Sequence, residues 1–339
     1  MYNTNESHGA ASRTVNADMS YDDAVRLGTD RALTELRKEK SADSLRDLAS
    51  GAALVVKTTN GVLTAWHKAC TSSMKSDEKK ARPAPSLRGI TARQGAELTM
   101  LYLDVVMSPV VAGDTARDAA LLALFDPADG IYTECSGKNH AITVFLRELN
   151  FTADERWIKE AVSALRDLAP LRAQTADEDQ VALDDCVFRM STRERLPYTP
   201  DLVFMAKNRT RLPEEEPELP RIQNADGTWW DPASWLLQTM GSEGLVRSIH
   251  EVNSRLLWPR VFTDDKVIAY YSSSGSNGKG TVLEMQRCMV GGPAGVRCAS
   301  IGLERFGGDK EFAMASMLNA VANLSDESDP DGFMKSSAL

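Results

Sequence analysis

The stretch "SSSGSNGKGT", residues 272–281, decides the fold that we predict for this chain. An apolar run, "KVIAYYSS" at 266–273, precedes it, and "TVLEMQRCMV" at 281–290 follows with helical character. A glycine-rich turn between a strand and a helix can curl its backbone N–H groups around a phosphate, and the helix N-terminus favours the anion. We therefore predict a phosphate-binding loop, with a strand over 266–273 before it and a helix after it that ends at Gly291-Gly292.

The stretch follows the P-loop pattern G-x-x-x-x-G-K-[ST] with two departures. Ser273 stands at the first glycine position and Gly280 at the hydroxyl position, so that the hydroxyl moves one residue on, to Thr281. A lysine supplies a point charge for terminal phosphates, and the hydroxyl is a ligand for magnesium. The expected nucleotide contacts are Ser273, Gly275, Ser276, Asn277, Gly278, Lys279, Gly280 and Thr281.

Alternating elements follow the loop. "VRCASIG" at 296–302 predicts a second strand, "KEFAMASMLN" at 310–319 a second helix, and "AVANLSDES" at 320–328 a third strand that ends in acids. Strands that alternate with helices at this spacing predict a parallel sheet. Acids after such a strand fit the Walker B pattern, in which Asp326 organises the magnesium shell and Glu327 polarises the attacking water. We therefore expect ATP and Mg²⁺ as cofactors.

Composition excludes several classes of protein. The chain has 339 residues, 42% of them apolar, and a net charge of −9, which argues against a protein that coats nucleic acid through a basic surface. No apolar run is long enough to cross a membrane, and the polar first 20 residues lack the apolar block of a signal peptide. The cysteines form no CxxC pair, which predicts free thiols, no structural metal and a cytoplasmic location. They are Cys70, Cys135, Cys186, Cys288 and Cys298.

Upstream of the loop, local patterns predict mostly helix with some strand. Periodic leucines predict a helix over 21–48, and Asn60-Gly61 between two β-rich runs predicts a hairpin. Further helices are expected over 91–107, over 114–125 with Asp114 or Thr115 as its cap, over 153–169, and from Asp231-Pro232 onward. The segment 72–89 is charged and contains prolines, so it is expected to be a loop. Short strands and turns are expected after Pro170.

These patterns divide the chain into four predicted parts. They are a disordered tail at 1–20, a mostly helical region at 21–150, an α+β region at 151–260 that precedes the ATPase, and an incomplete P-loop domain at 261–339.

The C-terminal part resembles a known family. "SGSNGKGT" followed by "ASMLNAVANLSDES" is similar to the helicase of phage and plasmid primase-helicases, which are superfamily-three AAA+-type proteins. "CVFRMSTRERLPYTPDLVFMAKNRTRLP", from Cys186 on, resembles the segment that precedes the helicase there. The resemblance covers roughly residues 150–339.

The resemblance implies an α/β P-loop AAA+ fold, of which this chain holds the first half, preceded by a mostly helical region. It implies an ATP-driven helicase that forms a homo-hexamer, moves along single-stranded DNA and works with replication proteins of a phage, prophage or plasmid in a bacterial cytoplasm. Lys279 and Thr281 would take the Walker A roles, and Asp326 and Glu327 the Walker B roles. Lys279 and Glu327 would then be the catalytic residues, and Thr281 and Asp326 the magnesium ligands.

The sequence departs from the family's pattern in ways that leave other functions open. No hydrophobic-D-x-D pair of a primase precedes residue 150, since Asp104 and Asp126 stand alone. The family's sensor asparagine and arginine finger follow Walker B, whereas this sequence stops at Leu339. We therefore expect residues 1–339 by themselves to bind ATP weakly and hydrolyse it little. The alternatives are an interaction protein that binds a nucleotide without turnover, and a nucleotide kinase, because adenylate kinases also read G-K-G-T.

Overall fold

The computed structural model describes most of the chain, in two compact units. Unit one comprises Met1–Phe125 and Thr133–Arg172, and unit two comprises Asp126–Tyr132 and Ala173–Leu339. The described residues are 13–41, 45–74, 83–110, 116–137, 140–215, 218, 220–258, 268–271, 277–291, 298–302, 317 and 320–325.

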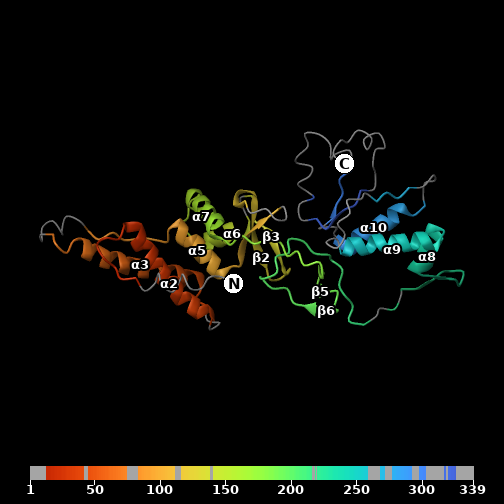
Figure 1. Ribbon diagram of the computed structural model, residues 1–339, viewed down its shortest axis with the longest axis horizontal. Helices are drawn as coiled ribbons and strands as arrows, with labels where there is room; N and C mark the ends of the chain where they lie inside the picture. The colour runs from red at the N-terminus through yellow and green to blue at the C-terminus, as the bar shows by residue number, and fades with distance from the viewer. Residues whose placement is uncertain are drawn as a thin grey trace. The chain divides into compact units, whose positions relative to one another are not determined.

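Unit one is a group of helices with a small antiparallel sheet (Figure 1). Its helices are α2 (Tyr21–Ser41), α3 (Leu48–Cys70), α5 (Ala92–Tyr102), α6 (Ala141–Leu149) and α7 (Glu155–Leu168). The sheet has the order β1 (Val105–Pro109), β2 (Ala120–Asp126), β3 (Ile131–Glu134), and a 3₁₀ turn, η1 (Arg117–Ala119), leads into β2. Val105 pairs with Leu124, and this register places the apolar side chains of β1 and β2 in the core of the unit.

Helices α2 and α3 pack closely at a glycine. A Cβ atom on Gly28 would lie 2.5 Å from the Cα of Thr59, which is closer than two carbon atoms can approach. Gln94 of α5 joins the same contact, because its Nε2 donates to Thr29 Oγ1 at 2.8 Å and to Thr59 Oγ1 at 3.2 Å. Its Oε1 accepts from the backbone N–H of Thr91 at 2.9 Å and so completes a capping box. One buried amide therefore connects three helices and also caps its own.

The predicted hairpin around Asn60-Gly61 is wrong, because both residues lie inside α3. Val55, Thr59 and Val62 are buried at helical spacing, and this apolar stripe outweighs the β preference of its branched side chains. Asn60 makes no turn. Its side chain instead bonds the backbone of Leu87 through both its oxygen and its nitrogen. The loop predicted at 72–89 is free of helix and strand over the residues that the structure describes, so this interpretation is confirmed there.

Two further helix predictions in unit one need correction. The helix predicted over 91–107 ends at Tyr102, and strand β1 begins at Val105. The stretch 114–125 is not a helix, since η1 and β2 occupy its described part, and the proposed caps Asp114 and Thr115 lie outside the described residues. A short, continuous apolar run such as "AALLALF" has neither period, so periodicity alone cannot separate strand from helix.

The amphipathic helix predicted over 153–169 is confirmed as α7. Asp154 caps it by accepting from the backbone N–H of Trp157, and the predicted apolar face is buried in the unit's core at Ile158, Ala161 and Leu165. The helix predicted over 21–48 is confirmed over Tyr21–Ser41 as α2, but residues 45–47 are not helical and Leu48 already begins α3.

Over its described residues, unit two combines three small sheets with three helices. The sheets are β4 (Gln180–Ala182), β5 (Val187–Arg189) and β6 (Glu194–Leu196), all antiparallel; β7 (Ile222–Gln223) with β8 (Trp229–Trp230), also antiparallel; and β9 (Cys298–Ala299) with β10 (Ala322–Asn323), which are parallel. The helices are α8 (Pro232–Met240), α9 (Glu243–Leu257) and α10 (Lys279–Gly291).

Two predictions hold well in unit two. Helix α8 starts as expected, with Asp231 accepting from the backbone N–H of Ser234 and Pro232 in the first turn, and Gly241 ends it in the left-handed conformation. The short strands expected after Pro170 are β4, β5 and β6.

The predicted sheet around the loop is present only in part. Ile268–Tyr271, the described part of the strand predicted over 266–273, is not a strand, and Tyr271 is 91% exposed. The predicted strands 296–302 and 320–328 do pair in parallel, as β9 and β10, over two residues each. Leu324 and Ser325 follow β10, and the predicted helix over 310–319 lies outside the described residues apart from Met317. None of the described helices is both long and apolar enough to cross a membrane.

Candidate functional site

The glycine–lysine turn is the centre of the predicted nucleotide site. Its described part begins at Asn277, and Gly278 has a φ of +84°, which residues with a side chain rarely adopt. Helix α10 starts at the next residue, Lys279. The sequence therefore places a glycine where the backbone must turn sharply into a helix.

Packing against α8 also leaves no room for a side chain at Gly278. A Cβ atom on Gly278 would lie 2.7 Å from Cγ2 of Thr239 and 3.5 Å from the ring of Trp235, both on α8. Helix α8 thus lies directly against the turn. A larger residue at Gly278 would have to adopt an unfavourable φ and also displace Thr239.

The N-terminus of α10 carries a positive charge beside the backbone N–H groups of its first turn. The ammonium of the half-buried Lys279 donates to Oδ1 of Asn277 at 2.8 Å. The hydrogen bond of Val282 N to Gly278 O, at 3.0 Å, marks the first helical turn, so helix geometry leaves the preceding N–H groups without a helical acceptor. These groups, the helix dipole and Lys279 together favour an anion at this end of α10.

The remaining predicted residues divide into two groups. Gly280 and Thr281 are exposed on the first turn of α10, so the structure brings them together with Asn277, Gly278 and Lys279. Lying outside the described residues are Ser273, Gly275, Ser276, Asp326 and Glu327.

The strand that leads to the predicted acids lies against the same helix. The guanidinium of Arg287 on α10 donates to the carbonyl oxygen of Leu324 at 3.4 Å, two residues before Asp326. Within the described ranges, no group of three or more His, Cys, Asp or Glu side chains could hold a metal ion.

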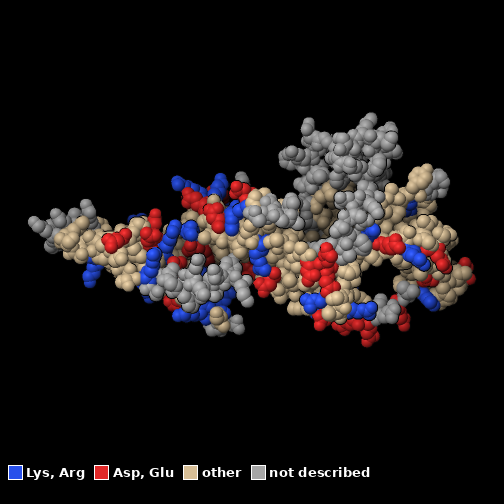
Figure 2. Space-filling model, viewed as in Figure 1, with Lys and Arg blue, Asp and Glu red and all other residues tan. Residues whose placement is uncertain are grey.

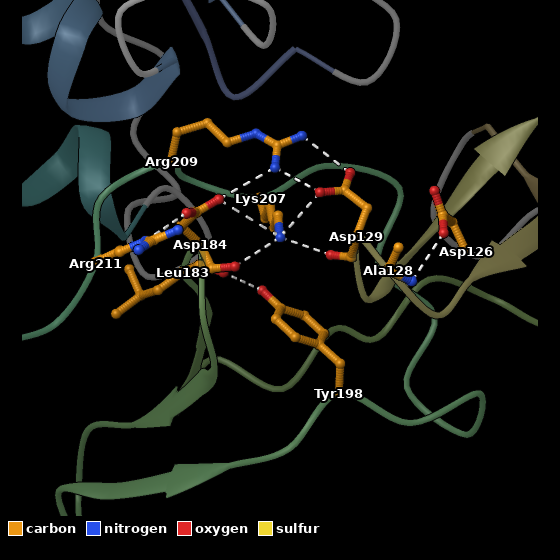
Figure 3. Close-up of polar contacts among 9 residues, drawn as sticks. All are labelled: Asp126, Ala128, Asp129, Leu183, Asp184, Tyr198, Lys207, Arg209 and Arg211. Atoms are coloured by element: carbon orange, nitrogen blue, oxygen red, sulfur yellow. Dashed lines mark hydrogen bonds and ion pairs between the residues drawn. The ribbon is translucent and has the colours of Figure 1, made fainter.

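A second charged cluster, which the sequence reading missed, surrounds Lys207 in unit two (Figure 3). The side chain of Lys207 is 3% exposed, and its Nζ donates to the carbonyl oxygens of Asp129 at 2.6 Å and Asp184 at 2.7 Å. The Oδ1 atoms of the same two aspartates lie 3.1 Å and 3.7 Å away. The ring of Tyr198 completes the enclosure, with its centroid 5.3 Å from Nζ. We call these residues, with Arg209 and Arg211, the Lys207 cluster.

The two arginines complete the pairing of the acids. Arg209 bonds both carboxylate oxygens of Asp129, at 2.5 Å and 3.0 Å, and Arg211 bonds Asp184 at 3.0 Å. The hydrogen bonds from Arg209 lower the pKa of Asp129 to about 2. Burial raises the pKa of Tyr198, whose hydroxyl donates to the carbonyl of Leu183.

The Lys207 cluster holds three segments together, and its charged groups are paired with one another. It joins the turn after β2, the turn between β4 and β5, and the extended segment that carries Lys207, Arg209 and Arg211 (Figure 3). The sequence does contain a signal, since basic residues at every second position of "AKNRTR" share one face of an extended chain. That signal does not identify the acidic partners, because Asp129 is 78 positions before Lys207.

No protein-family model matches the chain, and no curated protein matches it.

The charge on the surface is mixed. On the face shown in Figure 2, Lys and Arg side chains are interspersed with Asp and Glu. Among the described features, the turn at Gly278 is therefore the one that bears on function.

Proposed function

We propose that the chain binds ATP with magnesium through the turn at Gly278 and the N-terminus of α10, as part of a superfamily-three-type DNA helicase. In this proposal, ATP hydrolysis drives movement on single-stranded DNA during replication of a phage, prophage or plasmid. The full-length protein would be a homo-hexamer in the bacterial cytoplasm. Asp326 and Glu327 would take the magnesium and water-polarising roles after β10.

One observation carries the proposal. A glycine with a φ of +84° leads directly into a helix whose first residue is a lysine. This order places backbone donors, a helix dipole and an ammonium at a single point, which is what a chain of phosphates requires. The parallel pairing of β9 with β10 and the contact of Arg287 with Leu324 support it, because they bring the strand before Asp326 to α10.

The direct test replaces the lysine. Lys279→Ala removes the charge at the helix N-terminus, and its one described contact is with Asn277, two residues away. We expect ATP affinity in the presence of Mg²⁺ to fall at least about tenfold, since hydrogen bonds to charged groups contribute roughly 1.5–3 kcal/mol. Isothermal titration calorimetry measures the change.

Lys159→Ala is the matched control, because Lys159 is an exposed lysine on α7 in the other unit. It should bind ATP like the wild type. Equal affinities for wild type and Lys279→Ala would refute the proposed site. ATP turnover that rises with added single-stranded DNA would support the helicase and contradict the expectation of little turnover by residues 1–339. Binding without such turnover in the full-length protein would favour the nucleotide-binding interaction protein.

A further inference from the structure

The hairpin of β7 and β8 in unit two presents apolar side chains to solvent on both of its faces. Ile222 pairs with Trp230 and Gln223 pairs with Trp229, so Ile222 and Trp229 lie on opposite faces. Ile222 is 58% exposed and Trp229 is 61% exposed. Neither strand pairs with a further strand of the described chain. Apolar side chains gathered on one exposed element mark a surface for another molecule.

The hairpin is held in shape by the residues of its own turn. The backbone N–H of Asn224 donates to the carbonyl oxygen of Thr228 at 2.8 Å, and Gly227 has a φ of +83°. The carboxylate of Asp226 accepts from the backbone N–H of Thr228 at 2.9 Å and from its hydroxyl at 2.6 Å. A two-stranded hairpin is marginally stable by itself, so one that leaves its apolar side chains exposed gains stability when a partner covers it.

Acidic side chains accompany the hairpin along the chain. In the described part of 213–231, Arg221 is the one basic residue, and the acids are Glu214, Glu215, Glu218, Asp226 and Asp231. Hydrogen bonds from Thr228 lower the pKa of Asp226, so its carboxylate is ionised at neutral pH. Hydrogen bonds from Ser234 and then the charge of Arg221 lower the pKa of Asp231. Over the described residues, none of the three glutamates forms an ion pair.

This charge selects the kind of partner. Carboxylates repel the phosphates of a nucleic acid and the anionic headgroups of a membrane, and they attract lysine and arginine. Arginine also stacks its planar guanidinium on the ring of a tryptophan. A strand added to the edge of a hairpin places alternate residues on the two faces. Arginines on the face of Trp229 and apolar residues on the face of Ile222 would therefore match both faces.

We propose that the β7–β8 hairpin docks a basic, extended segment of another protein, in which arginine alternates with apolar residues. An arginine of this segment stacks on Trp229, and its neighbours pair with the carboxylates of Asp226 and Glu218. The apolar residues cover Ile222. This inference is independent of the proposed function, because it uses no residue of the turn at Gly278 or of α10.

Two synthetic peptides of opposite charge test the surface. The probe is fluorescently labelled Arg-Val-Arg-Val-Arg-Val-Arg, and Glu-Val-Glu-Val-Glu-Val-Glu is its acidic counterpart. Fluorescence anisotropy at about 0.15 M salt, where weak long-range attraction is screened, measures the affinity of the full chain for each. We expect the arginine peptide to bind at least about tenfold more tightly, because only it complements the carboxylates and the indole ring.

Replacing the aromatic ring locates the binding. Trp229→Ser should weaken binding of the arginine peptide at least about fivefold, since exposed tryptophans commonly carry much of the binding energy of an interface. Phe151→Ser is the matched control, because Phe151 is 85% exposed and belongs to unit one, and it should bind like the wild type.

Neutralising the acids tests the charge separately. The double variant Glu218→Gln and Asp226→Asn should weaken binding about two- to fivefold, as expected for the loss of two exposed ion pairs. Its control is Glu148→Gln with Asp118→Asn, which removes the same charge from exposed positions of unit one and should change the affinity less than about twofold.

Absence of binding to the wild-type chain, or equal binding by wild type and Trp229→Ser, would overturn the proposal. Oligothymidylate that displaces the arginine peptide from Trp229 would instead identify a nucleic-acid surface. A dimer in sedimentation that Trp229→Ser dissociates would identify a second copy of the chain as the occupant. Either result would also overturn the assignment to a basic segment. Where Trp229→Ser alters the circular dichroism spectrum, the double variant decides the location.

Discussion

Two lysines of unit two stand in opposite environments. Lys207 is 3% exposed and surrounded by oxygens from Asp129 and Asp184, whereas the ammonium of Lys279 has one described contact, with the nearby Asn277. The first charge is already neutralised by the fold, and the second stands at a helix end that attracts anions. A lysine that binds a ligand needs few acceptors around its ammonium, and among the described residues Lys279 meets this condition whereas Lys207 does not.

The largest expected effect is on the free energy of unfolding, which should fall much more when Lys207 is replaced than when Lys279 is replaced. Lys207→Met leaves two backbone carbonyls without their donor and removes one cation from the pair of aspartates. Arg209 and Arg211 still bind the acids, so we expect a loss of about 2–4 kcal/mol rather than complete unfolding. Urea denaturation followed by circular dichroism measures it. Lys279→Met should change stability by less than about 0.5 kcal/mol. A similar loss in both variants would remove the distinction between the two sites.

The next effect concerns the turn itself. Gly278→Ala forces a side chain into a φ of +84° and brings Cβ to 2.7 Å from Thr239. We expect a loss of about 1–2 kcal/mol in the free energy of unfolding and weaker binding of ATP. Gly244→Ala is the control, since a Cβ there has no neighbour within 4 Å and the residue lies in α9, where alanine favours the helix. Unchanged stability in Gly278→Ala would show that the turn tolerates a side chain.

The Lys207 cluster should contribute to the pH dependence of stability. The pKa of Asp129 is lowered to about 2, below its value in an unfolded chain. Its stabilising contribution is therefore complete above about pH 5 and is lost as the pH falls toward 2, by on the order of 1–2 kcal/mol. Denaturation curves at several pH values measure this loss. Asp129→Asn should flatten the curve in that range, and Lys279→Met should leave it unchanged. An unaltered slope in Asp129→Asn would refute the assignment.

The smallest effect tests the role of the displaced hydroxyl. Thr281 is exposed on the first turn of α10, so Thr281→Val should keep the fold. We expect magnesium-dependent ATP binding to weaken a few-fold, because the proposed site would lose one oxygen near the metal. Thr64→Val, at an exposed threonine of α3, should have no effect on binding. Calorimetry with and without Mg²⁺ compares the two, and equal magnesium dependence in Thr281→Val and wild type would exclude this role.

The sequence correctly predicted those elements that depend on residues only a few positions apart. The cap at Asp231, the proline after it and the long apolar face of α7 all act within a few residues, and each was confirmed. Asn60-Gly61 shows the limit of such signals. The packing of Thr59 against α2 and the bonds of Asn60 to Leu87 come from distant parts of the chain, and they hold this dipeptide in a helix.

The candidate site likewise has features that adjacent residues determine and features that distant residues determine. The turn at Gly278 and the start of α10 follow from adjacent residues, so the sequence predicted them. The Lys207 cluster depends on which distant side chains meet. A single sequence does not contain that information, and its charged residues resemble those of any solvated surface.

The contact at Gly28 has a consequence for how this sequence can vary among related proteins. The atom that a side chain would strike is the Cα of Thr59, which every amino acid possesses. No substitution at Thr59 can therefore make room for a larger residue at Gly28, and only a wider separation of α2 from α3 would do so. That separation would also pull apart the hydrogen bonds that Gln94 makes to Thr29 and Thr59. Relatives that keep this helix pair should therefore have glycine at the position of Gly28 whatever residue replaces Thr59.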